Sequence, residues 1–159
     1  MYLGDLMEKA ESGQFLVLSF LLQKSKTTVK QAMEETGFSK ATLTKYVVLL
    51  NDKAQEKGLD LKIRLADEIL SLLIGPAVKG REIRSLFLGN AIKYQILVYL
   101  LYHHQFLAHQ LSQELMISEA TLGRHLSSLN HILSEFDLSI QNGRLRGPEH
   151  QIRYFYFCL

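Results

Sequence analysis

Apolar residues recur along this chain at spacings of three and four, and one stretch of that pattern occurs twice. The segment 14–51 aligns without a gap on the segment 93–130, at a constant offset of 79 residues. The densest part of the match is Ser-x-Ala-Thr-Leu, which stands at 39–43 and again at 118–122. The repeat therefore predicts two tandem modules of similar fold.

Each module is expected to contain three helices. The first helix carries an apolar stripe, and the second is short, at about 28–36 in one copy and 107–115 in the other. A tight turn and a serine N-cap precede the third helix. The stripes of the first helices are Val17, Leu18, Leu21 and Leu22, and Ile96, Leu97, Leu100 and Leu101. The inward residues of the second helices are Val29, Ala32 and Met33, and Leu111. The third helices are expected to bury Leu43, Val47 and Leu50, and Leu122, Leu126 and Leu129.

After the third helix the apolar period changes from 3.6 to 2, which predicts a β-hairpin. In the first module the strands fall at 59–65 and 69–74, and in the second Asn142-Gly143 forms the turn. The expected fold class is mostly α with small β-hairpin wings, arranged as two tandem winged helix-turn-helix domains. We place the first domain at 1–79. The second domain, at 80–159, also includes the start of a linker helix at its C-terminal end.

A helix-turn-helix binds DNA when its third helix enters the major groove, while the hairpin wing contacts sugar and phosphate. Candidate DNA-binding residues lie on the polar face of each third helix, at its N-cap and on the wings. In the first module they are Thr28, Ser39, Lys40, Thr42, Thr44, Lys45, Lys62 and Arg64. In the second module they are Ser118, Glu119, Thr121, Arg124, His125, Arg144 and Arg146. Lys45 and Arg124 occupy the same repeat position, and either can donate to guanine or to phosphate.

The net charge of +2 is too small to indicate a binding partner. The distribution of charge along the chain is more informative. The stretch 24–64 holds nine basic and five acidic residues, so the first module is expected to dominate attraction to phosphate. All six histidines lie in the second module, and protonation of His125 is expected to tighten DNA binding.

Other functions fit the sequence less well. The polar faces could be no more than solvated helix surfaces, and tandem winged helices also serve as protein-docking modules without DNA readout, which is the leading alternative. The motifs of a phosphate loop, a serine nucleophile elbow and a zinc protease are absent, so no enzyme, cofactor or metal site is expected. A single cysteine and no long apolar run favour a cytoplasmic protein outside the membrane.

The repeated Ser-x-Ala-Thr-Leu and the segment 145–155, Leu-Arg-Gly-Pro-Glu-His-Gln-Ile-Arg-Tyr-Phe, resemble the N-terminal DNA-binding part of the Mga family. These are transcriptional regulators of virulence genes in Gram-positive bacteria, related to regulators that carry phosphotransferase-system regulation domains. The resemblance implies promoter binding and activation of virulence or sugar-linked genes. It also implies double-stranded DNA and RNA polymerase as partners, and a C-terminal half beyond Leu159 that carries homodimerisation and phosphorylation control.

Overall fold

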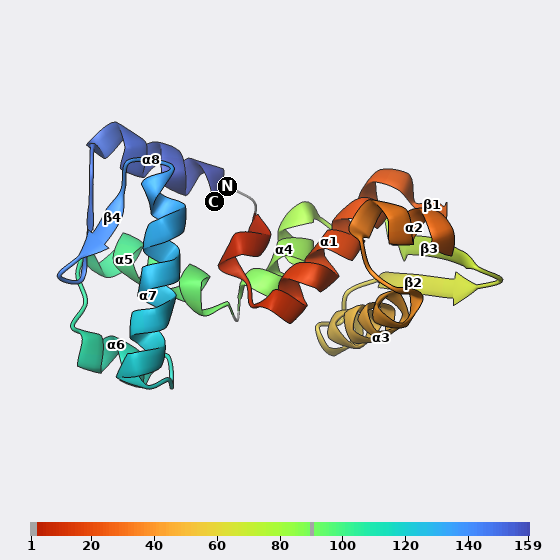
Figure 1. Ribbon diagram of the computed structural model, residues 1–159, viewed down its shortest axis with the longest axis horizontal. Helices are drawn as coiled ribbons and strands as arrows, with labels where there is room; N and C mark the ends of the chain where they lie inside the picture. The colour runs from red at the N-terminus through yellow and green to blue at the C-terminus, as the bar shows by residue number, and fades with distance from the viewer. Residues whose placement is uncertain (1–2, 90) are drawn as a thin grey trace. The chain divides into compact units, whose positions relative to one another are not determined.

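The computed structural model describes residues 3–89 and 91–159, shown as a ribbon in Figure 1. The described chain is mostly helical with small antiparallel sheets. It divides into two compact units: the first unit is 8–89, and the second unit combines 3–7 with 91–159.

The division between the units falls near residue 90, whereas the sequence placed the domain boundary at 79/80. The difference comes from the helix at 80–88, which packs into the first unit. Its Phe87 is fully buried, and the Phe87 ring meets the Phe15 ring edge to face at 5.4 Å between centroids. An aromatic pair of this kind holds the helix to the module that precedes it.

The first unit runs helix, strand, helix, helix, hairpin, helix (Figure 1). Its elements are α1 (Lys9–Lys24), β1 (Lys26–Thr28), α2 (Val29–Thr36), α3 (Lys40–Glu56), β2 (Leu61–Ala66), β3 (Ile69–Ile74) and α4 (Gly80–Leu88). Gly37 ends α2 at φ +74°, a left-handed conformation that glycine adopts without strain. The short turn to α3 follows from that cap.

The sheet of the first unit has the strand order β1-β3-β2, with both pairs antiparallel. Asp67 and Glu68 have φ of +53° and +59°, which gives the hairpin a turn whose twist matches its strands. The hairpin was predicted, but β1 was not. Ile63 and Leu72 are cross-strand partners on the face that packs into the core, together with Leu43 of α3.

The second unit has the same order of elements without a third strand among its described residues. A short 3₁₀ helix, η1 (Leu3–Leu6), belongs to it, and the Lys93 ammonium donates to the Asp5 carbonyl at 3.0 Å. The other elements are α5 (Ile92–His103), α6 (Ala108–Glu114), α7 (Glu119–Ser134), β4 (Ser139–Gln141), β5 (Arg144–Arg146) and α8 (Glu149–Cys158).

The Asn142-Gly143 turn joins β4 to β5 with positive φ at both residues, +51° and +73°, as the sequence predicted. The Phe106 N–H donates to the Gly143 carbonyl at 2.9 Å. A β-carbon on Gly143 would collide with the Phe106 carbonyl oxygen. Only glycine fits this position, because both the backbone angle and the close approach of Phe106 exclude a side chain.

An asparagine pair repeated at the offset of 79 ties each third helix to its wing. Asn51 of α3 donates to the Ile63 carbonyl at 2.8 Å and accepts from the Ile63 N–H at 2.7 Å. Asn130 of α7 makes the same two bonds with Ile140, at 3.2 and 2.6 Å. The identity of the two asparagines therefore has a structural cause, since each satisfies both backbone groups of a buried strand residue.

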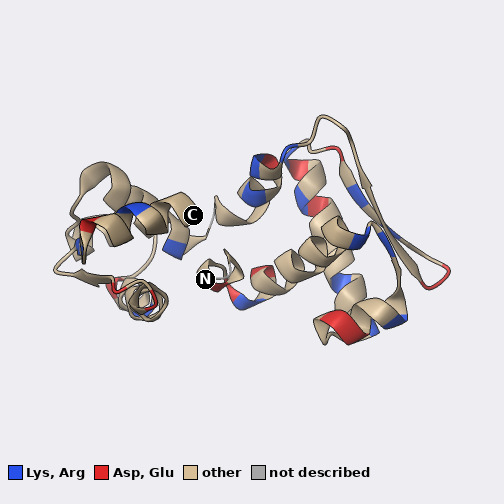
Figure 2. Cartoon of the chain, turned by 90° about the horizontal axis from the view of Figure 1, so that it is seen from above, with Lys and Arg blue, Asp and Glu red and all other residues tan. Residues whose placement is uncertain are grey.

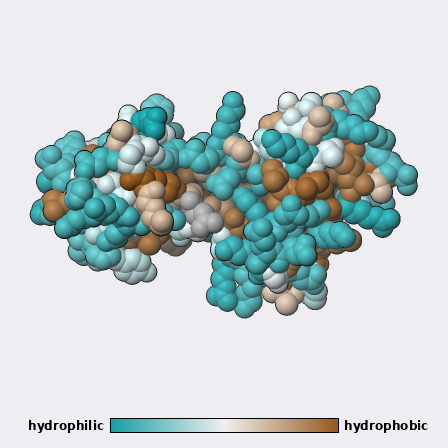
Figure 3. All heavy atoms as spheres, turned by 90° about the horizontal axis from the view of Figure 1, so that it is seen from below, coloured by the Kyte–Doolittle hydropathy of each residue, from teal (hydrophilic) through white to brown (hydrophobic). Residues whose placement is uncertain are grey.

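Some residues expected in the core lie at its edge. Met33 is 37 % exposed, Leu22 42 % and Leu101 45 %, while Leu126 is half-buried. The predictions that Met33 points inward and that α7 buries Leu126 were therefore wrong, while Leu22 and Leu101 form the exposed edge of their predicted stripes. Hydrophilic residues predominate on the face shown in Figure 3, and hydrophobic residues gather there in patches. No helix in the described ranges is long and apolar enough to cross a membrane.

Candidate nucleic-acid interface

Serine N-caps start both third helices, as the sequence predicted. The Ser39 hydroxyl accepts from the Thr42 N–H at 3.2 Å, and the Ser118 hydroxyl accepts from the Thr121 N–H at 3.1 Å. Each serine also bonds to the threonine hydroxyl, at 3.0 Å in the first unit and 2.9 Å in the second. These caps fix where each helix begins and therefore which side chains point outward.

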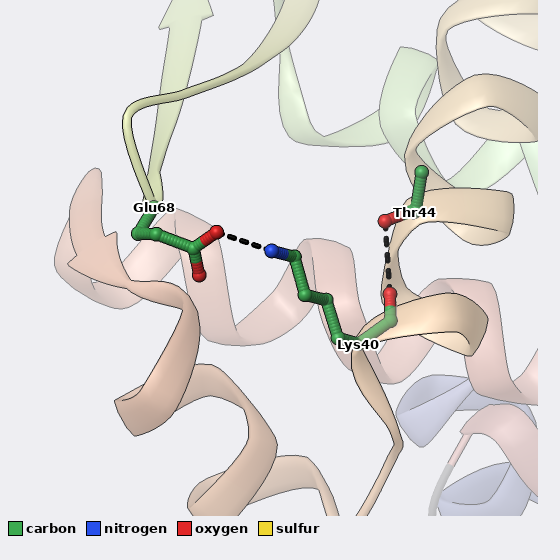
Figure 4. A network of polar contacts seen from close by, with 3 residues as sticks. All are labelled: Lys40, Thr44 and Glu68. Carbon is green, nitrogen blue, oxygen red and sulfur yellow. Dashed lines mark hydrogen bonds and ion pairs between the residues drawn. The ribbon is translucent and has the colours of Figure 1, made fainter.

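The outward face of α3 is a stripe of small and medium side chains around one cation. Ala41, Thr44, Lys45 and Val48 are all exposed and lie at helical spacings of three and four, opposite the buried face of the helix. The Thr44 hydroxyl donates to the Lys40 carbonyl at 2.9 Å (Figure 4), so its polar atom is already bonded within the helix. The sequence singled out Thr44 and Lys45 but missed Ala41 and Val48.

The outward face of α7 repeats this stripe at the offset of 79. Ala120, Gly123, Arg124 and Ser127 are all exposed, and Arg124 replaces Lys45 as the cation. An Arg124 guanidinium nitrogen donates to the Thr121 hydroxyl at 3.0 Å, which holds the side chain along the first turn of the helix. The repeat offset was the signal in the sequence that could have found the five residues missed in the two stripes.

Lys40 differs from Lys45 because it already has an acidic partner. Its ammonium pairs with the Glu68 carboxylate at the tip of the β2–β3 hairpin (Figure 4). The Glu68 carbonyl accepts from the Val29 N–H at 2.9 Å, which secures the hairpin tip to the start of α2. The tip carries two carboxylates, Asp67 and Glu68, and Figure 2 shows acidic residues at the end of this hairpin.

Other sequence candidates have local partners in the structure. Thr28 caps α2, where its hydroxyl accepts from the Gln31 N–H at 3.1 Å. Glu119 pairs with a ring nitrogen of His109 on α6, at 3.1 Å between Oε1 and Nδ1. His125 is half-buried and stands at the repeat position of Tyr46, which packs edge to face on Phe38. It therefore lies at the flank of the α7 stripe.

The basic wing residues lie on the solvent face of each hairpin. Because the Ile63 side chain is buried in the core, the alternate residues Lys62 and Arg64 point to the opposite face of the sheet. Arg64 and Lys26 flank Ser71 there, on the strands either side of β3. The sequence had not selected Lys26.

The second hairpin has the same arrangement. Arg144 and Arg146 lie opposite Gln141 and Ser139, on the face away from Ile140. A guanidinium nitrogen of Arg144 donates to the Gln105 side chain at 2.7 Å. The structure thus separates the candidates into two sets, the third-helix stripes and the outer wing faces.

The arrangement is suited to binding an extended polyanion. In 3–89 and 91–159, no group of three or more His, Cys, Asp or Glu side chains is placed to hold a metal ion. The stripes present a cation flanked by small side chains, and a helix with such a face can approach base edges closely.

Comparison with known protein families gives a match. Residues 77–159, just over half of the chain, match the family model described as the Mga helix-turn-helix domain. No curated protein matches the chain.

Proposed function

The chain belongs to the family of the Mga helix-turn-helix domain, and on that premise we propose that it binds double-stranded DNA through the outward stripes of α3 and α7. The activity is binding, in keeping with a family of DNA-binding regulators. We propose further that both units act as winged helix-turn-helix modules.

The observation that carries the proposal is the match between the two stripes. Both have one long cation at the same helical position, and both surround it with residues no larger than valine. A lysine or arginine can donate to the O6 and N7 atoms of guanine, and the threonine and valine methyl groups can pack on a thymine methyl. Solvated helix faces do not require this similarity of size and charge.

The wings supply a second set of contacts in this proposal. Lys62, Arg64, Arg144 and Arg146 lie on exposed strand faces and would bind sugar and phosphate, which positions the third helices without reading sequence. The first unit would supply the larger share of the electrostatic attraction, because the excess of basic residues falls in 24–64.

The family resemblance supports the finer parts of the role. These are activation of virulence or sugar-linked genes in the cytoplasm, contact with RNA polymerase, and homodimerisation. We assign no phosphorylation role to the histidines present here.

The test is a salt titration of binding to random and promoter-derived duplexes with the variants Lys45→Ala and Arg124→Ala. Each variant should weaken binding, and a lost phosphate contact should flatten the log-log salt slope by about 0.9. A lost guanine contact should instead cost about 1–3 kcal/mol on promoter DNA and little on random DNA.

Lys57→Ala is the matched control, because Lys57 is exposed at the far end of α3 and its replacement removes the same charge. If Lys45→Ala and Arg124→Ala bind as tightly as Lys57→Ala at low salt, the stripes do not contact DNA. Undetectable binding by the wild-type chain would favour the protein-docking alternative.

A further inference from the structure

An open groove of about 840 Å³ lies in the second unit between α5, β5 and α8. Its apolar lining comes from all three elements: Leu100, Leu101, Leu145, Ile152, Tyr156 and Phe157. Two of these side chains are unusually exposed for their type, Leu101 at 45 % and Phe157 at 88 %. Exposed apolar side chains that line a shared groove are a feature of binding surfaces.

A hydrogen bond from Tyr156 holds two walls of the groove together. The Tyr156 hydroxyl donates to the Leu97 carbonyl at 2.8 Å, which anchors α8 along α5. Burial raises the pKa of Tyr156 to about 12, so the hydroxyl stays neutral. The ring therefore contributes its apolar face to the groove while its polar atom is already bonded.

The edges of the groove are basic. Arg144, Arg146 and Arg153 line it along with His104, against the single carboxylate of Glu149. One guanidinium nitrogen of Arg153 lies 2.8 Å from Glu149, and both side chains are more than three-quarters exposed. An exposed pair of this kind is worth little and exchanges readily for a better partner. The lining thus combines an apolar centre with a surplus of positive charge.

This surface is distinct from the proposed DNA-binding stripe of α7, although it shares Arg144 and Arg146 with the proposed wing contacts. The lining residues come from α5, β5, α8 and the residue that caps α5, and none comes from α7. A phosphate backbone would use the arginines but would leave the leucine, isoleucine and phenylalanine side chains without a role. A neutral apolar segment would leave the arginines without partners.

We propose that this groove binds an acidic amphipathic helix of a partner protein. Apolar side chains of the helix at positions i, i+3, i+4 and i+7 would pack on Leu101, Ile152 and Phe157. Its flanking carboxylates would accept hydrogen bonds from the arginines, which favour planar, two-point contact with carboxylates. The inference goes beyond DNA binding and does not depend on it.

The test uses a fluorescently labelled synthetic peptide of about five helical turns, with leucines at helical spacing and glutamates on both flanks. Binding is followed by fluorescence anisotropy. Leu101→Asp and Arg153→Gln should each weaken the affinity by about tenfold, and added salt should weaken it further. A scrambled peptide of the same composition, and one with lysines in place of glutamates, should bind at least tenfold more weakly.

Leu22→Asp is the matched control, because Leu22 stands at the repeat position of Leu101 and is similarly exposed. It should leave peptide binding unchanged. Circular dichroism checks the fold of each variant, and Arg153→Gln, an exposed polar change, keeps the test valid should Leu101→Asp fail to fold.

Three results would overturn the proposal. They are equal binding of the scrambled or lysine peptide, equal effects of Leu22→Asp and Leu101→Asp, and an Arg153→Gln variant that loses duplex affinity and keeps peptide affinity. The last result would assign the groove to DNA. Duplex binding by the wild-type chain is measured in parallel, so that failure of DNA binding and failure of peptide binding are scored separately.

Discussion

Replacement of Asn51 by alanine should show how strongly each wing depends on its third helix. The change removes both bonds to the Ile63 backbone, and Ile63 is only 1 % exposed. Each unpaired buried group costs about 1–3 kcal/mol. Asn51 itself is half-buried, so water can reach part of the vacated space and the total should be about 2–3 kcal/mol. In the described sheet β2 is an edge strand, so no further strand can replace the lost bonds.

The assay is differential scanning calorimetry, since two compact units can give two transitions. For a domain of this size, about 2–3 kcal/mol lowers Tm by roughly 8–24 °C. Asn51→Ala should lower the transition of the first unit, and Asn130→Ala that of the second. Asp52→Ala, an exposed change one residue away, should move neither. A decrease for Asn51→Ala no larger than for Asp52→Ala would mean that the asparagine bonds do not hold the wing.

Two further changes test the second unit. Gly143→Ala should destabilise it by about 3 kcal/mol or more, as measured by urea unfolding, because it combines left-handed strain of about 1–2 kcal/mol with a collision against the Phe106 carbonyl. Gly37→Ala, with the same φ and open space around it, should cost its own unit the strain alone. His125→Gln should lower duplex affinity less than Arg124→Ala does, because His125 is half-buried at the flank of the α7 stripe whereas Arg124 is exposed on it. An equal loss in both variants would place His125 at the DNA.

The three helices of each module, the serine caps and the hairpin turns could be predicted because their signals are local. A cap needs a serine and the next turn of helix, and Asn142-Gly143 specifies its own turn. The exposed positions of Lys45 and Arg124 also follow from helical spacing alone, once the buried face is known.

What could not be predicted depends on contacts between distant residues. Strand β1 has three residues, and it exists because β3 pairs with it. The assignment of α4 to the first unit depends on the ring contact of Phe87 with Phe15, 72 residues away in sequence. The repeat showed that Asn51 and Asn130 are alike, but only the structure shows that each bonds to a strand ten or twelve residues later.

The pairing of Lys40 with Glu68 changes what is expected of the first module. From the sequence, Lys40 counts as a cation available to phosphate, but in the structure a wing-tip carboxylate already opposes it. DNA that meets the start of α3 must either displace Glu68 or accept a carboxylate beside its backbone. Glu68→Gln removes that charge and should therefore tighten binding to every duplex, with a salt slope steeper by up to about 0.9.

This effect should arise without a change of fold. The Lys40 and Glu68 side chains are both more than half exposed, and such pairs add little to stability, so the unfolding midpoint should stay unchanged. Glu56→Gln, the same substitution at the exposed C-terminal end of α3, controls for net charge. In a Lys40→Ala background, Glu68→Gln should tighten binding less than in the wild type, since no lysine is released. If Glu68→Gln binds DNA no more tightly than Glu56→Gln, Lys40 at the start of α3 does not contact phosphate. The DNA contact of α3 must then be assigned to the stripe around Lys45 alone.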